Sequence, residues 1–129
     1  MSRRAKEAAR IGEATELELA SRRADGTLRP FTTMWVVAIG DDIYVRSAGG
    51  PDRPWYRRAR AAGAGRIRAA GIDVDATFVD AAGSAPHDAI DAAYHAKYDR
   101  YGPRPVGAVT GPDAHRVTVQ LIPDHESRS

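Results

Sequence analysis

The stretch from Thr32 to Tyr56 constrains the fold more than any other part of the chain. Two strand-like runs, 34–39 and 43–47, lie on either side of the turn Gly40-Asp41-Asp42, and the small residues Ser47-Ala48-Gly49-Gly50 follow. Glycine has no Cβ, so backbone N–H groups in such a loop can approach an anion closely. The stretch therefore predicts a strand pair that ends in a loop suited to binding an anion.

Alternating apolar and polar residues predict more strands on both sides of this stretch. The Asp25-Gly26 pair is typical of a hairpin turn, and the run Met34–Ile39 is apolar on both faces, as expected of a central strand. The predicted strands are 15–22, 28–39, 43–47, 66–70, 72–80 and 115–122. The residues expected to be buried are Trp35, Val37, Ile39, Val45 and Val117.

Two helices interrupt the strands, over 55–62 and 86–101, and the segment 102–112 is rich in Gly and Pro and is expected to be irregular. Many short strands joined by turns favour a closed or split barrel over a sandwich. The fold class is therefore mainly β: a six-stranded antiparallel split barrel with two or three added helices.

The length of 129 residues suits a single domain with a real core. Residues 1–13 favour a helix or a frayed tail, residues 14–123 form the barrel domain, and residues 124–129 are expected to be a disordered tail.

Composition excludes several classes of function. The chain has no cysteine, which rules out disulfides and thiolate chemistry, and no apolar run is long enough to span a bilayer. The charged N-terminus lacks a signal-like apolar region, so we expect a cytoplasmic protein with no membrane partner. A net charge of +2 gives no argument for nucleic acid. The basic residues are nearly all arginine, which binds phosphate well. A compositional bias of the genome is the simpler explanation of the high arginine content.

Four arginines are candidates for a phosphate site: Arg23, Arg29, Arg46 and Arg53 could converge if the barrel closes. Their guanidinium groups would act together with backbone N–H groups of the 47–50 loop. The alternative is that these arginines are solvated charges at strand edges.

The aromatic residues allow two interpretations. Trp55 follows the glycine loop and could form a pocket wall, whereas Trp35 is expected in the core. Tyr94 and Tyr98 share one face of the second helix and could bind a substrate, but such a stripe more often covers a barrel mouth or a dimer interface. The four histidines show no metal-ligand spacing, so no metal site is predicted; His95 is expected to pair with Asp91 on the exposed helix face.

The segment from about Leu17 to Phe78 resembles the flavin-binding split barrels, the superfamily of pyridoxamine-phosphate-oxidase-like proteins. Among them it is most similar to the deazaflavin-dependent nitroreductases. The matching pieces are Arg22 to Arg29, Trp35-Val36-Val37, Gly40-Asp41, Ser47-Ala48-Gly49-Gly50 and Pro54-Trp55-Tyr56. Over nearly its whole length the chain resembles an uncharacterised bacterial family, the domain of unknown function 2255, which shares the Tyr-x-x-Lys-Tyr helix found here at Tyr94 to Tyr98.

The resemblance implies an oxidoreductase that uses FMN or a deazaflavin coenzyme to transfer hydride to or from a small organic substrate. It also implies a homodimer with the cofactor site across the subunit interface. The alternative is a split barrel without a cofactor that binds or transforms a small molecule without redox chemistry. The expected cofactor-binding residues are Arg23, Arg29, Ser47, Gly49, Gly50 and Trp55; no catalytic residue is predicted.

Two departures from the nitroreductase pattern stand out. The Asn-Leu that follows Trp-Tyr in those proteins is replaced here by Arg57 to Ala61, and the glycine-rich hairpin turn reads Arg22-Arg23-Ala24-Asp25-Gly26-Thr27-Leu28-Arg29. These departures concern the part of the resemblance that implies cofactor binding.

Overall fold

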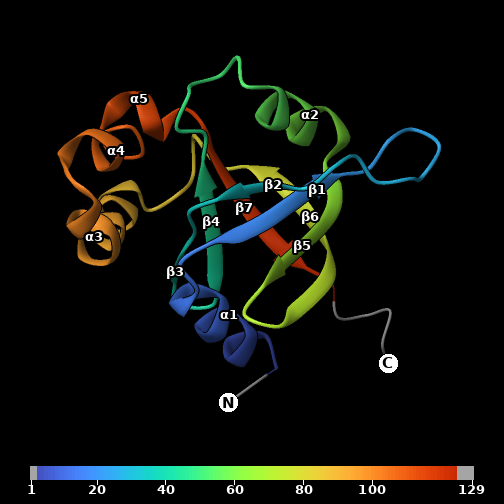
Figure 1. Ribbon diagram of the computed structural model, residues 1–129, viewed down its shortest axis with the longest axis horizontal. Helices are drawn as coiled ribbons and strands as arrows, with labels where there is room; N and C mark the ends of the chain where they lie inside the picture. The colour runs from blue at the N-terminus through green and yellow to red at the C-terminus, as the bar shows by residue number, and fades with distance from the viewer. Residues whose placement is uncertain (1–2, 125–129) are drawn as a thin grey trace.

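The computed structural model describes residues 3–124 and is built around one curled antiparallel sheet (Figure 1). The strands are β1 (Leu17–Ser21), β2 (Thr32–Met34), β3 (Val37–Ile39), β4 (Asp42–Arg46), β5 (Ala64–Ala69), β6 (Ile72–Asp80) and β7 (Thr118–Pro123). The helices are α1 (Arg3–Glu13), α2 (Pro54–Ala62), α3 (His87–Tyr98), the 3₁₀ turn η1 (Asp99–Tyr101), α4 (Pro103–Gly107) and α5 (Pro112–His115).

The strand order shows that the sheet is curled. The order is β2-β1-β5-β6-β7-β4-β3, with every neighbouring pair antiparallel. β2 and β3 lie at opposite ends of this order, yet only Trp35 and Val36 separate them in the chain. A link this short spans at most about 11 Å. The two edges of the sheet therefore come together where the chain crosses from β2 to β3.

The prediction of one continuous central strand over 28–39 is wrong. The segment contains two short strands, β2 and β3, which lie at the two edges of the sheet. The backbone at Val36 is bonded to α3 instead of to a strand. The Val36 N–H donates to the Tyr98 hydroxyl (3.1 Å), and the Lys97 Nζ donates to the Val36 carbonyl (2.6 Å). This division gives seven strands where six were predicted, while the mainly β, all-antiparallel class is confirmed.

The helices lie around the sheet in separate places (Figure 1). α1 occupies the segment expected to be a helix or tail, and it buries Ala8 and Ile11. α2 lies at the opposite end of the sheet, and α3, α4 and α5 pack together on one side. The predicted irregular segment contains α4, and the predicted strand 115–122 begins only at Thr118 because His115 ends α5.

Two hydrophobic clusters hold these layers together. The larger one fills the curl of the sheet and includes residues of α1 and α2, and the smaller one joins β3 and β4 to α3 and α4. Val37, Val45 and Val117 are buried as predicted, whereas Trp35 and Ile39 are only partly buried at the edge of the smaller cluster.

Among residues 3–124, no helix has the length and apolar character needed to cross a membrane. Residues 125–129, most of the predicted tail, lie outside the described residues.

Candidate functional site

The loop after β4 is a tight turn whose polar groups mostly bond to each other. The Ser47 hydroxyl donates to the Gly50 carbonyl (2.6 Å), and the Gly50 N–H donates to the Ser47 carbonyl (3.0 Å). Gly50 has φ 88°, a conformation that favours glycine. Ser47 itself is buried, and its N–H donates to the Val117 carbonyl (3.3 Å). The turn is therefore rigid, and its exposed face consists of Ala48 and Gly49.

Gly49 is needed for a different reason. A Cβ at this position would lie 1.6 Å from Arg53 Nε, so the arginine side chain packs directly on the glycine backbone. The Arg53 side chain thus occupies the space where any other residue at position 49 would place its Cβ.

Helix α2 follows the loop and has clear start and stop signals. Pro54 occupies its first turn, where a missing N–H costs nothing, and Gly63 ends it in the left-handed conformation (φ 68°). Tyr56 and Ala59 face the sheet, which leaves Arg57 and Arg58 exposed.

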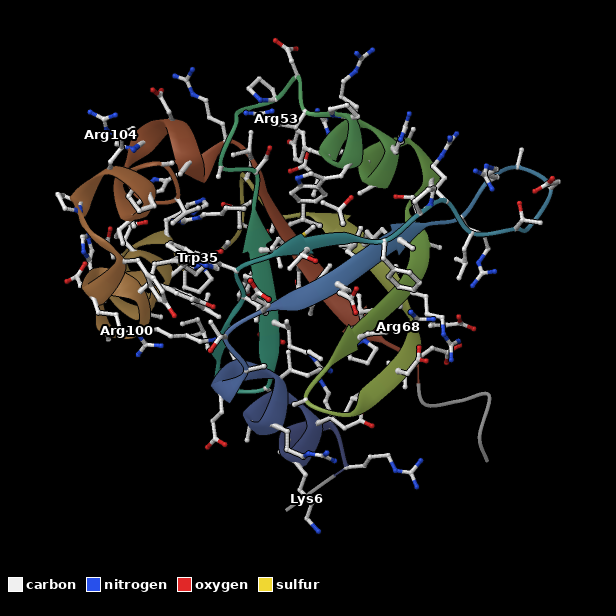
Figure 2. All side chains as sticks on the ribbon, viewed as in Figure 1. Lys6, Trp35, Arg53, Arg68, Arg100 and Arg104 are labelled. Carbon is white, nitrogen blue, oxygen red and sulfur yellow. The ribbon has the colours of Figure 1, made fainter. Side chains whose placement is uncertain are left out.

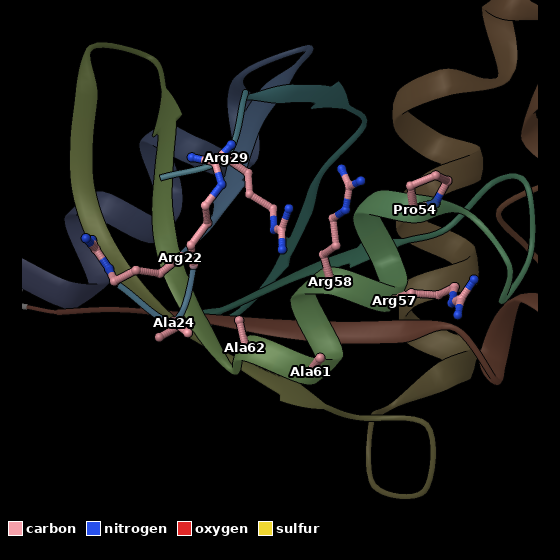
Figure 3. A pocket seen from close by; sticks show the side chains of 10 residues that line it. Arg22, Ala24, Arg29, Pro54, Arg57, Arg58, Ala61 and Ala62 are labelled. Atoms are coloured by element: carbon pink, nitrogen blue, oxygen red, sulfur yellow. The ribbon is translucent and has the colours of Figure 1, made fainter. Parts of the chain in front are cut away.

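The first hollow beside α2 is the arginine groove, which we define by Arg22, Arg23, Arg29, Arg57 and Arg58. It has a volume of about 840 Å³ and lies between the 22–29 hairpin and α2. Figure 3 shows the side chains of Arg29 and Arg58 extending into the space between these two walls, whereas Arg57 points to the side away from Arg29.

Two of the groove arginines already have partners in the protein. Arg22 pairs with Asp75 (2.9 Å), and Arg23 donates to the Leu28 carbonyl (2.9 Å). Within residues 3–124, no carboxylate lies within 4 Å of the guanidinium groups of Arg29, Arg57 or Arg58. These three cations are available to a ligand, and guanidinium groups match the geometry of phosphate and carboxylate.

The second hollow is the tryptophan cleft, which we define by Trp35, Trp55, Arg53, Gly49 and Val109. It has a volume of about 450 Å³, within the range of small-molecule sites. Arg53 and Trp55 line the cleft while Pro54 between them lines the groove, so the two hollows flank the start of α2.

Trp35 is held in place by an aromatic stack. Its ring lies parallel to that of Tyr98, with centroids 4.1 Å apart, and Tyr101 packs at 5.5 Å. Trp35 lies where the sheet meets the helices of the second half of the chain (Figure 2). Because one partner of the stack is fully buried, the indole is a fixed wall of the cleft.

A third group of polar residues lies between the sheet and α3, with Arg46, Tyr94 and Tyr98 buried and Asp91 and Lys97 partly buried. We call it the polar seam and define it by Arg46, Asp91, Tyr94, Lys97 and Tyr98. The Arg46 side chain has no exposed area, and it forms an ion pair with Asp91 and donates to Thr118 Oγ1 (2.9 Å) and the Val109 carbonyl (2.8 Å). The positive charge of Arg46 is therefore paired within the protein.

Two histidines complete the surroundings of Arg46. Arg46 Nη2 lies 3.1 Å from His87 Nδ1. Because an arginine can only donate, Nδ1 accepts this hydrogen bond. The ring proton of His87 is therefore on Nε2, which donates to the Ala82 carbonyl (2.8 Å). The ring of His115 stacks on His87, and its Nε2 bonds Asp91 (3.0 Å).

Asp91 is the anion at the centre of this arrangement. Partial burial alone would raise the pKa of its carboxyl. Hydrogen bonds from Arg46, His115 and the Gly111 N–H outweigh burial and hold the pKa below its usual value. The predicted pair of Asp91 with His95 is wrong, since His95 pairs with Asp99 (2.8 Å).

The structure distributes the predicted cofactor residues over three separate hollows. Arg23 and Arg29 line the groove, Gly49 and Trp55 line the cleft, and Ser47 and Gly50 line a smaller hollow facing α5. The predicted convergence of four arginines is wrong: Arg23 and Arg29 line the groove, whereas Arg53 lines the cleft together with Arg46, whose charge is paired with Asp91 in the seam. The predicted substrate-binding residues Tyr94 and Tyr98 have no exposed surface.

Sequence reasoning missed the contribution of Arg57, Arg58 and Trp35 to the two hollows. The signal for the arginines was their outward position on a helix that begins directly after the glycine loop. Trp35 gave no such signal, because an apolar run is equally typical of a core strand.

Comparison with known proteins identifies the family. The model of uncharacterized proteins conserved in bacteria, the domain of unknown function 2255, matches residues 7–121. The chain belongs to this family. None of the curated proteins matches it.

Several solved structures have a similar fold. An F420 reductase is 21% identical with a TM-score of 0.58, and the match covers 90% of this chain and 91% of the reductase. A conserved hypothetical protein of Mycobacterium tuberculosis is 20% identical, with a TM-score of 0.60 over 97% and 82% of the two chains. A Listeria innocua protein with a provisional assignment as a pyridoxamine 5'-phosphate oxidase is 13% identical, with a TM-score of 0.63 over 96% and 95%. This family member therefore has the split-barrel fold that the sequence motifs predicted.

Proposed function

We propose that this protein is an oxidoreductase that binds FMN or a deazaflavin coenzyme and transfers hydride to or from a small organic substrate. The observation that carries the proposal is the arginine groove, where three guanidinium groups without a carboxylate partner in residues 3–124 lie beside an aromatic cleft. A phosphate-bearing planar cofactor needs both features: cationic donors for one end and an apolar wall for the other. The names of the F420 reductase and the oxidase-type protein support this choice.

The residues present fit such a cofactor. Arg29 and Arg58 would receive the phosphate from opposite walls of the groove (Figure 3), which Arg23 also lines. Trp55 would form the wall for the ring, and the exposed 48–49 backbone would lie along its edge. When bound, the cofactor supplies the hydride chemistry itself, and the protein supplies the phosphate contacts, the ring surface and protection from water.

Ser47 and Gly50 have a narrower role in this proposal than the sequence gave them. Their hydroxyl and N–H bond to each other's carbonyl groups, so they shape the turn. We propose that they keep Gly49 and Arg53 in place and do not bind the phosphate directly.

We also propose that the protein is a cytoplasmic homodimer, as the family resemblance implies. Light scattering at micromolar concentration measures its mass directly. A monomer mass would contradict a cofactor site shared across a subunit interface.

The second candidate is a split barrel that binds a small molecule without redox chemistry. The polar seam favours it in one respect, because Tyr94 and Tyr98 have no exposed surface and cannot donate a proton to a ligand as they stand. Titration of the purified protein with FMN and with the deazaflavin coenzyme, followed by cofactor fluorescence, separates the two. Saturable binding of either cofactor supports the oxidoreductase. If neither cofactor binds, the result supports the split barrel that binds a small molecule without redox chemistry.

A further inference from the structure

The tryptophan cleft has features that a cofactor phosphate does not explain. The chain contains two tryptophans, and both line this cleft. Trp35 enters from the crossing between β2 and β3, and Trp55 enters from α2, so the aromatic surfaces come from separate elements. A hollow with two indole surfaces is suited to a planar aromatic ligand.

Arg53 gives this cleft an uncommitted positive charge. The other arginine that lines it, Arg46, has its charge matched by Asp91 inside the polar seam. In the part of the chain that the structure describes, no carboxylate lies within 4 Å of the Arg53 guanidinium. Glu16 also lines the cleft without pairing with Arg53. The ligand therefore meets a cation with free donors beside the aromatic walls.

Gly49 fixes where this cation lies. Arg53 Nε would be 1.6 Å from a Cβ at position 49, so only glycine lets the arginine fold back over the turn. Gly49 does not have a left-handed φ, in contrast to Gly50. An alanine at position 49 is therefore compatible with the backbone, and its effect falls on the flexible Arg53 side chain.

We infer that the tryptophan cleft binds the substrate, and that the substrate is a small planar aromatic molecule carrying an anionic group such as a carboxylate. The aromatic ring of the substrate lies against Trp35, while Trp55 remains the wall for the cofactor ring, and the anion pairs with the Arg53 guanidinium. The role as a substrate site rests on the proposed function, whereas binding of the aromatic anion does not.

Benzoate is the probe for this site, and tryptophan fluorescence is the readout. Because both tryptophans line the cleft, a change in their emission reports on this hollow. We expect saturable quenching by benzoate, and binding weaker by about tenfold or more for the uncharged benzamide, which lacks the charge-assisted hydrogen bond. Cyclohexanecarboxylate, which keeps the charge and loses the planar ring, should also bind more weakly than benzoate.

Two variants test the geometry. Arg53→Gln should weaken benzoate about tenfold or more and leave benzamide nearly unchanged. Gly49→Ala should have the same direction of effect, because its Cβ displaces Arg53 while the arginine itself remains. Arg104→Gln is the matched control: it removes an exposed arginine from α4 outside the cleft and should bind benzoate like the wild type. Thermal unfolding of each variant checks that the fold is intact.

The inference is overturned if benzoate gives no saturable change in tryptophan fluorescence up to about 20 mM. Even a weak ligand with a Kd of about 1 mM would nearly saturate the site at that concentration. Equal affinity for benzoate and benzamide also overturns it, as does wild-type behaviour of folded Arg53→Gln. The FMN titration is done separately and decides the proposed function. If FMN binds and benzoate does not, only this inference is rejected. If benzoate binds and neither cofactor does, the cleft is still a site for an aromatic anion, and the proposed oxidoreductase function is rejected.

Discussion

The arginine groove and the polar seam use the same residue type in opposite ways. In the seam, Arg46 has a fully buried side chain, and its donors reach a carboxylate, a hydroxyl, a carbonyl and a histidine. In the groove, Arg29 and Arg58 reach toward open space and have no carboxylate partner among residues 3–124 (Figure 3). A buried charge must be matched by the protein, whereas an unmatched charge persists only where water or a ligand solvates it. The seam therefore stabilises the fold, and the groove is where function is expected.

The largest expected effect is on the seam. Arg46→Met should lower the free energy of unfolding by about 3–5 kcal/mol, because it leaves the Asp91 carboxylate without its cation. Arg58→Met, in the groove, should change it by less than about 0.5 kcal/mol, since the side chain is exposed. Urea denaturation of both variants measures the difference. Equal losses of unfolding free energy in the two variants would contradict the claim that the seam stabilises the fold and the groove does not.

The next effect falls on the groove. Arg29→Ala should weaken binding of FMN or deazaflavin by about 1.5–3 kcal/mol, the scale of a charge-assisted hydrogen bond, with little change in stability. Arg104→Ala removes an exposed arginine outside the groove and serves as the control. Cofactor affinity is measured by fluorescence titration. If both variants bind as tightly as the wild type, Arg29 does not contact the phosphate.

Two tyrosines of the seam allow a sharper test of what burial requires. The Tyr98 hydroxyl donates to the Thr15 carbonyl (2.7 Å) and accepts from the Val36 N–H, whereas the Tyr94 hydroxyl is buried with no hydrogen-bond partner among the described residues. Tyr98→Phe should cost about 1–3 kcal/mol of stability because it leaves a buried N–H unpaired. Tyr94→Phe should be neutral or stabilise by about 1 kcal/mol. Chemical denaturation compares them, and a larger loss for Tyr94→Phe would contradict this assignment.

The smallest effect is a pH dependence at Lys97. Burial lowers the pKa of this lysine from 10.5 to about 8, so the folded protein releases the proton at a lower pH than the unfolded chain does. The unfolded chain then binds more protons from about pH 8 upward, and stability should rise with pH over that window. Burial also raises the pKa of Tyr98 to about 12, which opposes this trend above pH 10.

Urea denaturation between pH 7 and 9.5 measures the Lys97 effect before the tyrosines titrate. Lys97→Met should flatten the rise, since methionine keeps the aliphatic bulk and does not titrate. An equal slope in Lys97→Met and wild type would assign the dependence to another group.

Local sequence signals predicted the strands well where the turn chemistry was explicit. The Asp25-Gly26 hairpin and the pairing of β5 with β6 follow from such signals. The break at Val36 could not be predicted, because its backbone partners are Tyr98 and Lys97, more than sixty positions away. An apolar run cannot reveal which of its residues bonds to a distant helix.

The candidate site was predicted by residue type but not by arrangement. Arg29 and Trp55 do line hollows, yet they line different ones. The folding of Arg53 over Gly49 and the burial of Arg46 depend on side-chain directions that a strand or turn pattern does not specify. The glycine loop does allow a close approach, that of the Arg53 side chain to Gly49, whereas the approach of an anion stays a prediction.

The measurement that tests the central claim most directly is the preference for FMN over riboflavin, which differ by the phosphate alone. We compare the wild type with the triple variant Arg29→Gln, Arg57→Gln and Arg58→Gln, which removes the unpartnered cations of the groove. The wild type should bind FMN at least about tenfold more tightly than riboflavin, and the variant should bind both alike. Equal affinities in the wild type, or a preference that survives in the folded variant, would contradict phosphate binding by the arginine groove.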